Sequence, residues 1–234
     1  MIPFFDGHND LLLKMTLGRV SAEQVRDGHS NGQIDLPRVR AGGLGGGFFA
    51  LFVPTPGGTG MDMRAMRQDS YDLPLPDRLE HGIALAKVRE GIDHFDRLAD
   101  LEVITPCRTA DEVERAVHGP SLAAVLHMEG AEAIGPDLAE LDELYGRGLR
   151  SLGPVWSRST IFGHGVPFRY PSNSDIGPGL SEAGKALVRA CNQRRIMVDL
   201  SHLNMAGLRD VAAISDAPLV ATHSNAHAVT ASAR

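Results

Sequence analysis

Short apolar runs alternate with longer amphipathic stretches along most of the chain. Six runs are apolar on both faces, as buried parallel strands are, and they lie at 2–5, 45–53, 122–126, 149–155, 196–200 and 218–222. Apolar residues recur at three- and four-residue steps between them, which predicts helices over 77–101, 109–117, 138–145, 181–192 and 205–214. This alternation predicts a parallel sheet with helical crossovers.

An open doubly wound sheet and a closed barrel both fit this alternation, and the polar residues favour the barrel. Polar side chains follow different predicted strands at their carboxyl ends: His8 and Asp10, Glu129, Trp156 and Arg158, His202, and His223. In a barrel these ends converge on one mouth, whereas in an open sheet they are strung along an edge. We therefore expect an α/β fold, a TIM-type (β/α)8 barrel of the metal-dependent hydrolase type, with about six of the eight βα units present. No repeat or low-complexity linker divides residues 1–234, so one domain is expected.

Composition and charge narrow the possible partners. The net charge of −6 argues against nucleic acid, because phosphate binding needs clustered Lys and Arg. Cys107 and Cys191 lie in no CxxC pair and are expected to be reduced thiols. The first apolar run stops at Phe5, too early for a signal peptide, and no stretch approaches the ~20 apolar residues of a membrane span. A cytoplasmic protein without membrane contacts is the expectation.

Histidines and carboxylates at strand ends suit a metal ion. His8 and Asp10 are two residues apart in an extended segment, so both can project toward one ion. Glu129 ends a buried strand, where a carboxylate is costly unless it is paired or metal-bound, and Glu132 is the nearby competitor. His127 is expected to face away from these neighbours. Each residue taken alone is as well explained by an ordinary turn, ion pair or hydrogen bond.

Together, five such residues at one barrel mouth predict a metal site. Imidazoles and carboxylates suit zinc, with manganese or iron as alternatives. Two ions sharing one carboxylate would hold a bridging water and make hydroxide available near neutral pH, which is chemistry for hydrolysing an amide or ester. Asp199, three residues before His202, is placed to orient a ligand imidazole. The glycine cluster at 42–47 lacks the Lys-Ser/Thr of a phosphate loop and indicates close backbone packing instead.

Seven stretches, in the same order along the whole chain, resemble the renal (membrane) dipeptidase family of zinc metallopeptidases. They are DGHNDL at 6–11, GGLGGGFF at 42–49, HMEGAEAIG at 127–135, GLRSL at 148–152, GLSEAG at 179–184, VDLSH at 198–202 and THSNA at 222–226. The resemblance implies two zinc ions, one held by His8 and Asp10 and one by His202 and His223, with Glu129 as the bridging carboxylate.

The same resemblance implies a dipeptidase that hydrolyses the peptide bond of small dipeptides through a metal-bridging hydroxide, with Glu129 and Asp10 as catalytic residues. Whether the protein forms a homodimer is left open. Arg234 falls where the family places an arginine that holds the substrate carboxylate, a role that suits a guanidinium. Trp156 stands where studied members have a histidine that contacts the substrate carbonyl. That contact would fall to a metal ion, to Arg158 or to His164.

Two other functions stay open, namely a related lactonase or amidohydrolase and a catalytically inactive, metal-stabilised binding module. The family continues through two more strands and an aspartate beyond the position of Arg234. The sequence therefore predicts an unclosed barrel with two unpaired edges, a frayed Arg234, and a chain that alone is poorly soluble or inactive. The long loops 54–75 and 157–179 are expected to be functional, and the second is predicted to fold over the mouth and contact substrate.

Overall fold

The computed structural model describes residues 2–56 and 64–234, so part of the loop predicted at 54–75 lies outside the described residues. All pairings within its main sheet are parallel, as βα units require. The order is β1-β2-β5-β6-β8, and β4 pairs with the start of β5. The strands are β1 (Phe4–Asn9), β2 (Leu44–Phe52), β4 (Ile104–Pro106), β5 (Leu122–Glu129), β6 (Leu149–Gly153) and β8 (Met197–Val198).

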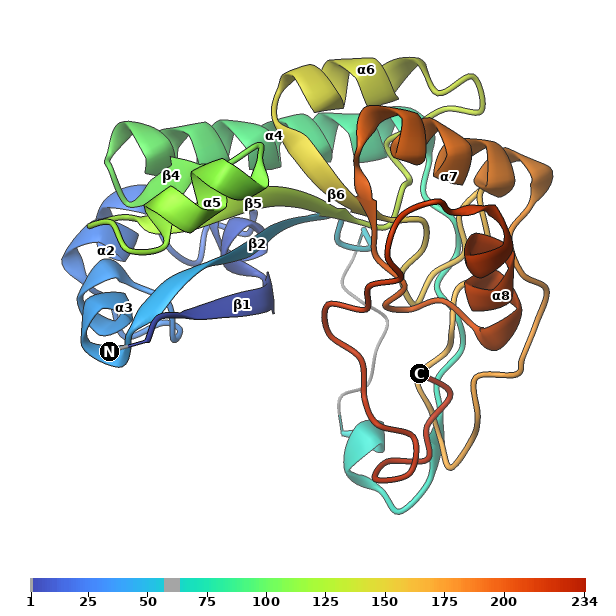
Figure 1. The fold of residues 1–234 in the computed structure, drawn as a ribbon. Helices are drawn as coiled ribbons and strands as arrows, with labels where there is room; N and C mark the ends of the chain where they lie inside the picture. The colour runs from blue at the N-terminus through green and yellow to red at the C-terminus, as the bar shows by residue number, and fades with distance from the viewer. Residues whose placement is uncertain (1, 57–63) are drawn as a thin grey trace.

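The sheet curls into part of a barrel, with helices over its outer face (Figure 1). This is the predicted barrel architecture in an open form. The helices are α1 (Leu11–Thr16), α2 (Ala22–Asp27), α3 (Leu36–Gly42), α4 (His81–Asp100), α5 (Ala110–Ala116), α6 (Ala139–Gly146), α7 (Glu182–Arg194) and α8 (Met205–Ile214). The five predicted helices correspond to α4–α8. The first three helices have only six or seven residues each, too few for their periodicity to stand out.

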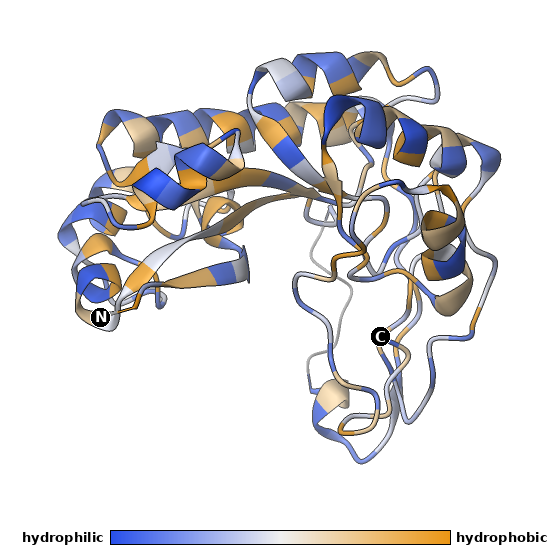
Figure 2. Ribbon diagram, viewed as in Figure 1, coloured by the Kyte–Doolittle hydropathy of each residue, from blue (hydrophilic) through white to orange (hydrophobic). Residues whose placement is uncertain are grey.

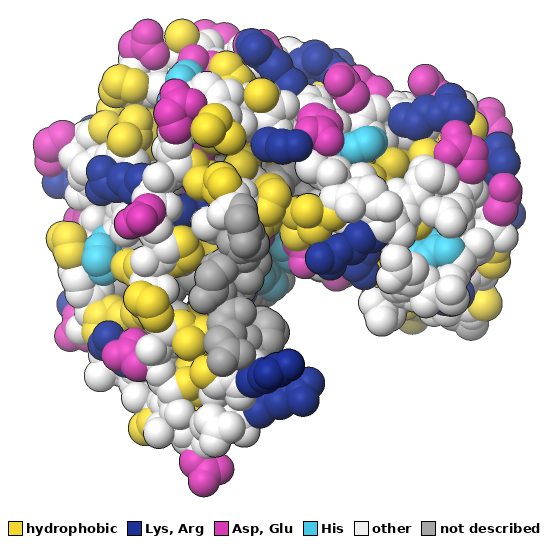
Figure 3. All heavy atoms as spheres, turned by 180° about the vertical axis from the view of Figure 1, so that it is seen from behind, with side chains coloured by type: hydrophobic (Ala, Val, Ile, Leu, Met, Phe, Trp, Pro, Cys, Tyr) yellow, Lys and Arg dark blue, Asp and Glu magenta, His cyan; other side chains and the backbone are white. Residues whose placement is uncertain are grey.

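Local sequence explains where these elements begin and how they pack. At α5 the Thr109 hydroxyl accepts from the Glu112 backbone N–H, and the Glu112 carboxylate accepts from that of Thr109. α4 buries Val88, Ile92 and Phe95, which recur at three- and four-residue steps. Figure 2 shows the strands as mostly hydrophobic and the outer helices as mixed. From behind, acidic and basic side chains are interspersed over the surface (Figure 3).

β5 is the central strand, and all eight of its residues are buried. A Cβ on Gly46 of β2 would lie 2.3 Å from the carbonyl oxygen of Ala123 in β5. The predicted close backbone packing at the glycine cluster is therefore present, because only glycine leaves room for this approach.

Within the main sheet, two strands differ from the sequence prediction. The run at 218–222 forms no regular strand, and its Val220 makes one isolated parallel bridge to Asp199. Conversely, β4 was not predicted, since three residues ending in Pro106 are too short to show a pattern. The described sheet is thus open, with β1 at one edge and β8 at the other.

The two long loops are joined to each other. β3 (Tyr71–Asp72) pairs antiparallel with β7 (Arg169–Tyr170). The Arg169 carbonyl also accepts a 3.1 Å hydrogen bond from the Ala233 N–H. Residues 231–234 are therefore held against the second loop, and Ala233 is completely buried. The frayed end predicted at Arg234 is wrong for this structure. None of the helices in the described ranges has the length and apolar character that a membrane crossing requires.

Candidate metal centre

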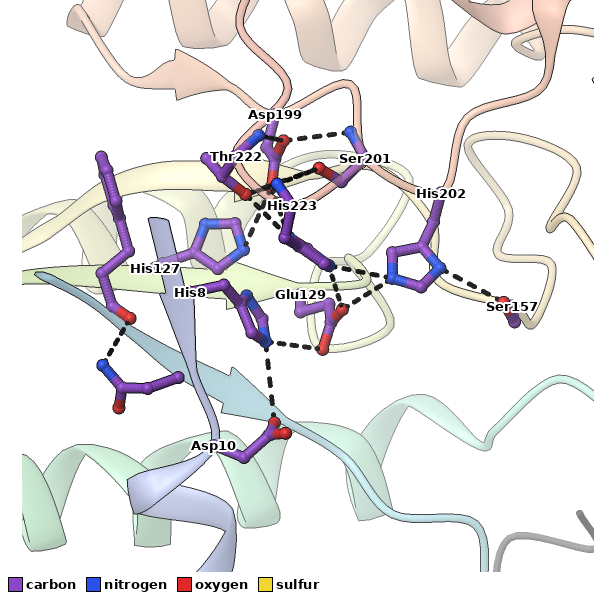
Figure 4. A network of polar contacts seen from close by, with 12 residues as sticks. His8, Asp10, His127, Glu129, Ser157, Asp199, Ser201, His202, Thr222 and His223 are labelled. Carbon is purple, nitrogen blue, oxygen red and sulfur yellow. Dashed lines mark hydrogen bonds and ion pairs between the residues drawn. The ribbon is translucent and has the colours of Figure 1, made fainter. Parts of the chain in front are cut away.

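The five side chains singled out by the sequence meet around Glu129, at the carboxyl ends of the strands (Figure 4). Glu129 Oε1 lies 2.9 Å from His202 Nε2 and 3.2 Å from His223 Nε2. Glu129 Oε2 lies 3.6 Å from His8 Nε2, and that nitrogen lies 3.6 Å from Asp10 Oδ1. The two carboxylate oxygens of Glu129 therefore face different sets of ligand-type atoms.

The backbone brings these residues together from distant parts of the chain. Glu129 ends β5, and His8 lies near the end of β1. A Cβ on Gly7 would lie 2.2 Å from the Thr222 carbonyl oxygen, so a glycine at this position lets β1 approach the segment that carries His223. His202 has a left-handed backbone with φ of 66°, which is uncommon for a residue with a side chain. His202 lies in the turn that follows β8, where Leu203 N–H donates to Leu200.

Burial and charge set the protonation of these groups without metal. Burial opposes ionisation of Glu129, yet hydrogen bonds from His202 and His223 hold the pKa of its carboxyl well below its ordinary value. Burial lowers the pKa of His202 to about 4, against the attraction of Glu129. Burial also acts to lower the pKa of His8, but Asp10 and Glu129 outweigh it and raise that pKa. The metal-free site thus holds the anionic carboxylate of Glu129 beside the largely neutral imidazole of His202.

The outer nitrogens of two imidazoles are held by hydroxyl groups. His202 Nδ1 lies 3.2 Å from Ser157 Oγ, and His223 Nδ1 lies 2.8 Å from Thr222 Oγ1. The sequence placed Asp199 as an orienting group, and it acts on the His223 side, since Thr222 Oγ1 donates to Asp199 Oδ2 at 2.6 Å. Ser157 and Thr222 were not recognised from the sequence, although each lies directly beside a residue that was.

His127 does not face away from the site, as the sequence analysis expected. It lies two residues before Glu129 on β5, so strand alternation places both side chains on the same face. Its ring is completely buried, with Nδ1 2.8 Å from Ser151 Oγ and Nε2 3.7 Å from Asp199 Oδ2. Burial lowers the pKa of His127 to about 4, so the ring is neutral.

The site opens into a pocket of about 270 Å³. It is lined by His8, Asp10, Leu13, Phe52, Glu129, Trp156, His202, His223 and Arg234. Trp156 is wedged between Phe52 and Phe168, at ring-centroid distances of 4.8 and 5.9 Å. The Arg234 Nη2 donates to the His223 carbonyl at 3.0 Å, and burial lowers the pKa of this guanidinium. Trp156 and Arg234 therefore both line the pocket beside the five converging side chains.

Arg158 and His164 do not line this pocket. Arg158 is completely buried and its guanidinium donates to Glu132, Thr55 and the Val53 carbonyl, at 2.8 to 3.0 Å. The substrate contact predicted for Arg158 is therefore wrong, since its donors brace the protein frame. The ring of His164 instead packs against Gly177, in the space that a Cβ at that position would fill.

The pairing of Glu132 with Arg158 shows which of the two carboxylates, Glu129 or Glu132, faces the histidines. Glu132 Oε1 accepts the 2.8 Å hydrogen bond from Arg158 Nε, and Glu132 is not among the residues that line the pocket. Only Glu129 of these two carboxylates faces the imidazoles.

The loop 157–179 supports the pocket from behind. None of its described residues lines the pocket, and the substrate contacts expected from this loop stay a prediction. It supplies Phe168 behind Trp156, and its backbone binds residues 231–233 through Arg169 and Ser172. The loop therefore positions Trp156 and Arg234.

Comparisons with known proteins identify similar sequences and a similar structure. An uncharacterised protein of the PQQ-III 3′ region from Acinetobacter calcoaceticus is 36% identical over an alignment of 242 positions, which covers 100% of this chain and 74% of that protein. Dipeptidase verJ from Clonostachys rogersoniana is 27% identical over 98% of this chain and 56% of its own length. A solved structure, a metallopeptidase from Rhodobacter sphaeroides bound to a phosphinate mimic of the dipeptide L-Ala-D-Ala, is 48% identical. Its match to this chain has a TM-score of 0.95 and covers 100% of this chain and 68% of the metallopeptidase chain.

The chain thus spans between about half and three quarters of the length of these proteins. The model of the membrane dipeptidase family, peptidase family M19, matches residues 1–234. The predicted family, the barrel architecture and the metallopeptidase class are confirmed by these matches. On this match, the chain belongs to the membrane dipeptidase family, M19, of metallopeptidases.

Proposed function

We propose that this chain carries the site of a zinc-dependent dipeptidase, with one zinc ion held by His8 and Asp10, a second by His202 and His223, and Glu129 shared by both. The supporting observation is that the two carboxylate oxygens of Glu129 face different residues. Its Oε2 faces His8, and its Oε1 faces His202 and His223. A carboxylate oriented in this way can serve two cations at once.

The donor set fits this metal. One oxygen of Glu129 and one nitrogen each of His8 and His223 lie within 4.8 Å of one another, close enough to surround one or two cations. Imidazole nitrogens with carboxylate oxygens suit zinc, and the nearly neutral imidazole of His202 needs no deprotonation to bind it. When bound, a pair of zinc ions would supply a hydroxide nucleophile near neutral pH and polarise the carbonyl.

The chain's own residues would hold the substrate beside that nucleophile. Arg234 lies in the pocket with a guanidinium suited to a terminal carboxylate. Trp156 and Phe52 form an aromatic wall and leave a small space, which fits a dipeptide better than a longer chain. A small dipeptide as substrate also agrees with the L-Ala-D-Ala mimic bound by the similar metallopeptidase.

The test combines metal analysis with turnover. Zinc bound per chain is measured by elemental analysis, and hydrolysis is followed on a panel of dipeptides, N-acyl amino acids and lactones. Because Arg234 is held beside the pocket and is not frayed, we expect two zinc ions per chain and hydrolysis of dipeptides, contrary to the inactivity predicted from an unclosed barrel. Turnover of lactones or N-acyl amino acids alone would replace the dipeptide with another substrate class. Bound zinc without turnover on any substrate would indicate an inactive, metal-stabilised module.

A further inference from the structure

A line of polar groups lies behind His223, partly buried at Thr222 and fully buried at Asp199 and His127. Its Nδ1 is 2.8 Å from Thr222 Oγ1, which is 2.6 Å from Asp199 Oδ2. Asp199 Oδ2 in turn lies 3.7 Å from His127 Nε2. His127 and Asp199 are 0% and 1% exposed, so water does not interrupt the line at that end. Figure 4 shows Thr222 and Asp199 above His223 in this view, with the His127 ring beside them.

The direction of each hydrogen bond follows from Asp199. Its two carboxylate oxygens face three donors, which are the Thr222 hydroxyl and the backbone N–H groups of Ser201 and Thr222. An ionised carboxylate can only accept, and Asp199 Oδ1 already accepts from the backbone N–H groups of Ser201 and Thr222, each at 3.0 Å. The hydroxyl proton of Thr222 must therefore point to Asp199 Oδ2.

The remaining protons are fixed in turn. Since the Thr222 hydroxyl gives its proton to Asp199, its oxygen can only accept from His223, so His223 carries its proton on Nδ1. That leaves Nε2, which lies 3.2 Å from Glu129 Oε1, to bind the proposed metal. At the other end, His127 Nδ1 lies 2.8 Å from Ser151 Oγ, and His127 Nε2 lies 3.7 Å from Asp199 Oδ2, beyond hydrogen-bond distance.

We infer that Thr222, Asp199 and His127 form a positioning relay that holds His223 in its metal-binding tautomer and places a buried negative charge behind it. This inference rests on the proposed function and deepens it. A hydrogen-bonded carboxylate behind a ligand imidazole raises its basicity and fixes its ring orientation. His202 is held differently, because its partner Ser157 is a neutral hydroxyl.

Two matched pairs of variants test the relay by zinc affinity, measured by competition with a chelator. Thr222→Val removes the hydroxyl at nearly constant shape, and Thr222→Ser keeps it. His127→Leu removes the polar ring beside Asp199, and His127→Gln keeps an N–H group there. We expect zinc affinity at one of the two sites to fall by about 10- to 100-fold in Thr222→Val and by a smaller factor in His127→Leu. Thr222→Ser and His127→Gln should stay close to wild type.

A structural role alone would not produce this pattern, so the thermal midpoint of each metal-free variant is measured alongside. Equal zinc affinity in Thr222→Val and wild type overturns the relay, while wild-type binding of zinc leaves the proposed function standing. If the wild-type protein binds no zinc, both ideas fail together. Ring nitrogen NMR of the metal-free wild-type protein needs no variant to fold: we expect a proton on His223 Nδ1, and an unprotonated Nδ1 would overturn the inference.

Discussion

The two sides of Glu129 are built in different ways. On the side of His202 and His223, each outer ring nitrogen meets a hydroxyl group, and Asp199 lies buried behind. On the side of β1, His8 Nδ1 is buried without a hydrogen-bond partner among the described residues, and the Asp10 side chain is 51% exposed. β1 is also an edge strand, with Phe4 and Phe5 exposed.

This difference indicates which part of the site is rigid before metal binds. Residues carried by the interior of the fold have partners from several segments, so their rotamers are fixed in advance. Residues on the edge strand have fewer neighbours and depend on the ion, and on Glu129, for their orientation. We therefore expect the two sides to respond differently to mutation, chelation and pH.

The largest effect is expected at Glu129, because this residue joins the two sides. Glu129→Gln replaces a shared anion by a neutral amide, which is a poor bridge between two cations. Zinc content should fall, and kcat/KM should drop by more than the roughly 100-fold typical of a residue that only orients a ligand. The matched control is Glu132→Gln, whose carboxylate pairs with Arg158 away from the pocket. Full zinc and full activity in Glu129→Gln would remove this residue from the centre.

The second prediction concerns Arg158, which braces the side of His202. Arg158→Met leaves Glu132 buried without its cation, and removing one partner of a buried ion pair costs about 3–5 kcal/mol. Urea denaturation should show this loss in the free energy of unfolding, while KM for a dipeptide changes little in the protein that remains folded. A raised KM at unchanged stability would instead return Arg158 to the substrate pocket.

The third prediction concerns chelation of the two ions. Since His8 lacks a partner on Nδ1 and Asp10 is half exposed, the ion on the β1 side should be held about 10- to 100-fold more weakly. Zinc release against increasing chelator should then have two steps. His8→Ala should abolish the weaker step and His202→Ala the tighter one. A single step, or a weaker step that depends on His202, would contradict the comparison.

The sequence predicted the site more fully than the fold that surrounds it. His8, Glu129, His202 and His223 were found because each follows an apolar run, and the ends of parallel strands converge whatever the details of the loops. The run at 218–222 was predicted as a strand on the same grounds, yet it makes one bridge, because apolar composition does not tell whether a partner strand is in register.

Side-chain direction beyond a strand end could not be predicted. Arg158 follows Trp156 by two residues, but its guanidinium turns to Glu132, which lies on a segment far away in the sequence. The orientation of His127 was available from the sequence, since residues i and i+2 of a strand share a face and Glu129 was already placed. Ser157 and Thr222 carry no signal of their own, because hydroxyl residues are common in loops.

The smallest effect is expected from the pH dependence of stability in the metal-free protein. It has opposite signs for the histidines on the two sides of Glu129. His202 and His127 have a folded pKa of about 4, below the ordinary 6.5, so the folded state binds fewer protons than the unfolded one between these values. Stability should therefore fall as pH drops below 6.5, by about 1 kcal/mol for each ring between pH 6.5 and 5.5. His8 has a raised pKa, so its contribution is fully present below pH 6.5 and is lost as pH rises through its folded value.

Histidine ring NMR against pH separates these contributions, with the thermal midpoint as the second measurement. We expect His8 to protonate first as pH falls, and His202 and His127 to stay neutral until about pH 4. His127→Gln serves as the control, because it removes one neutral ring and should make the thermal midpoint less dependent on pH below 6.5. If His202 and His8 titrate together near 6.5, burial and hydrogen bonding do not distinguish the two sides of Glu129 in solution, and the asymmetry drawn from the structure is wrong.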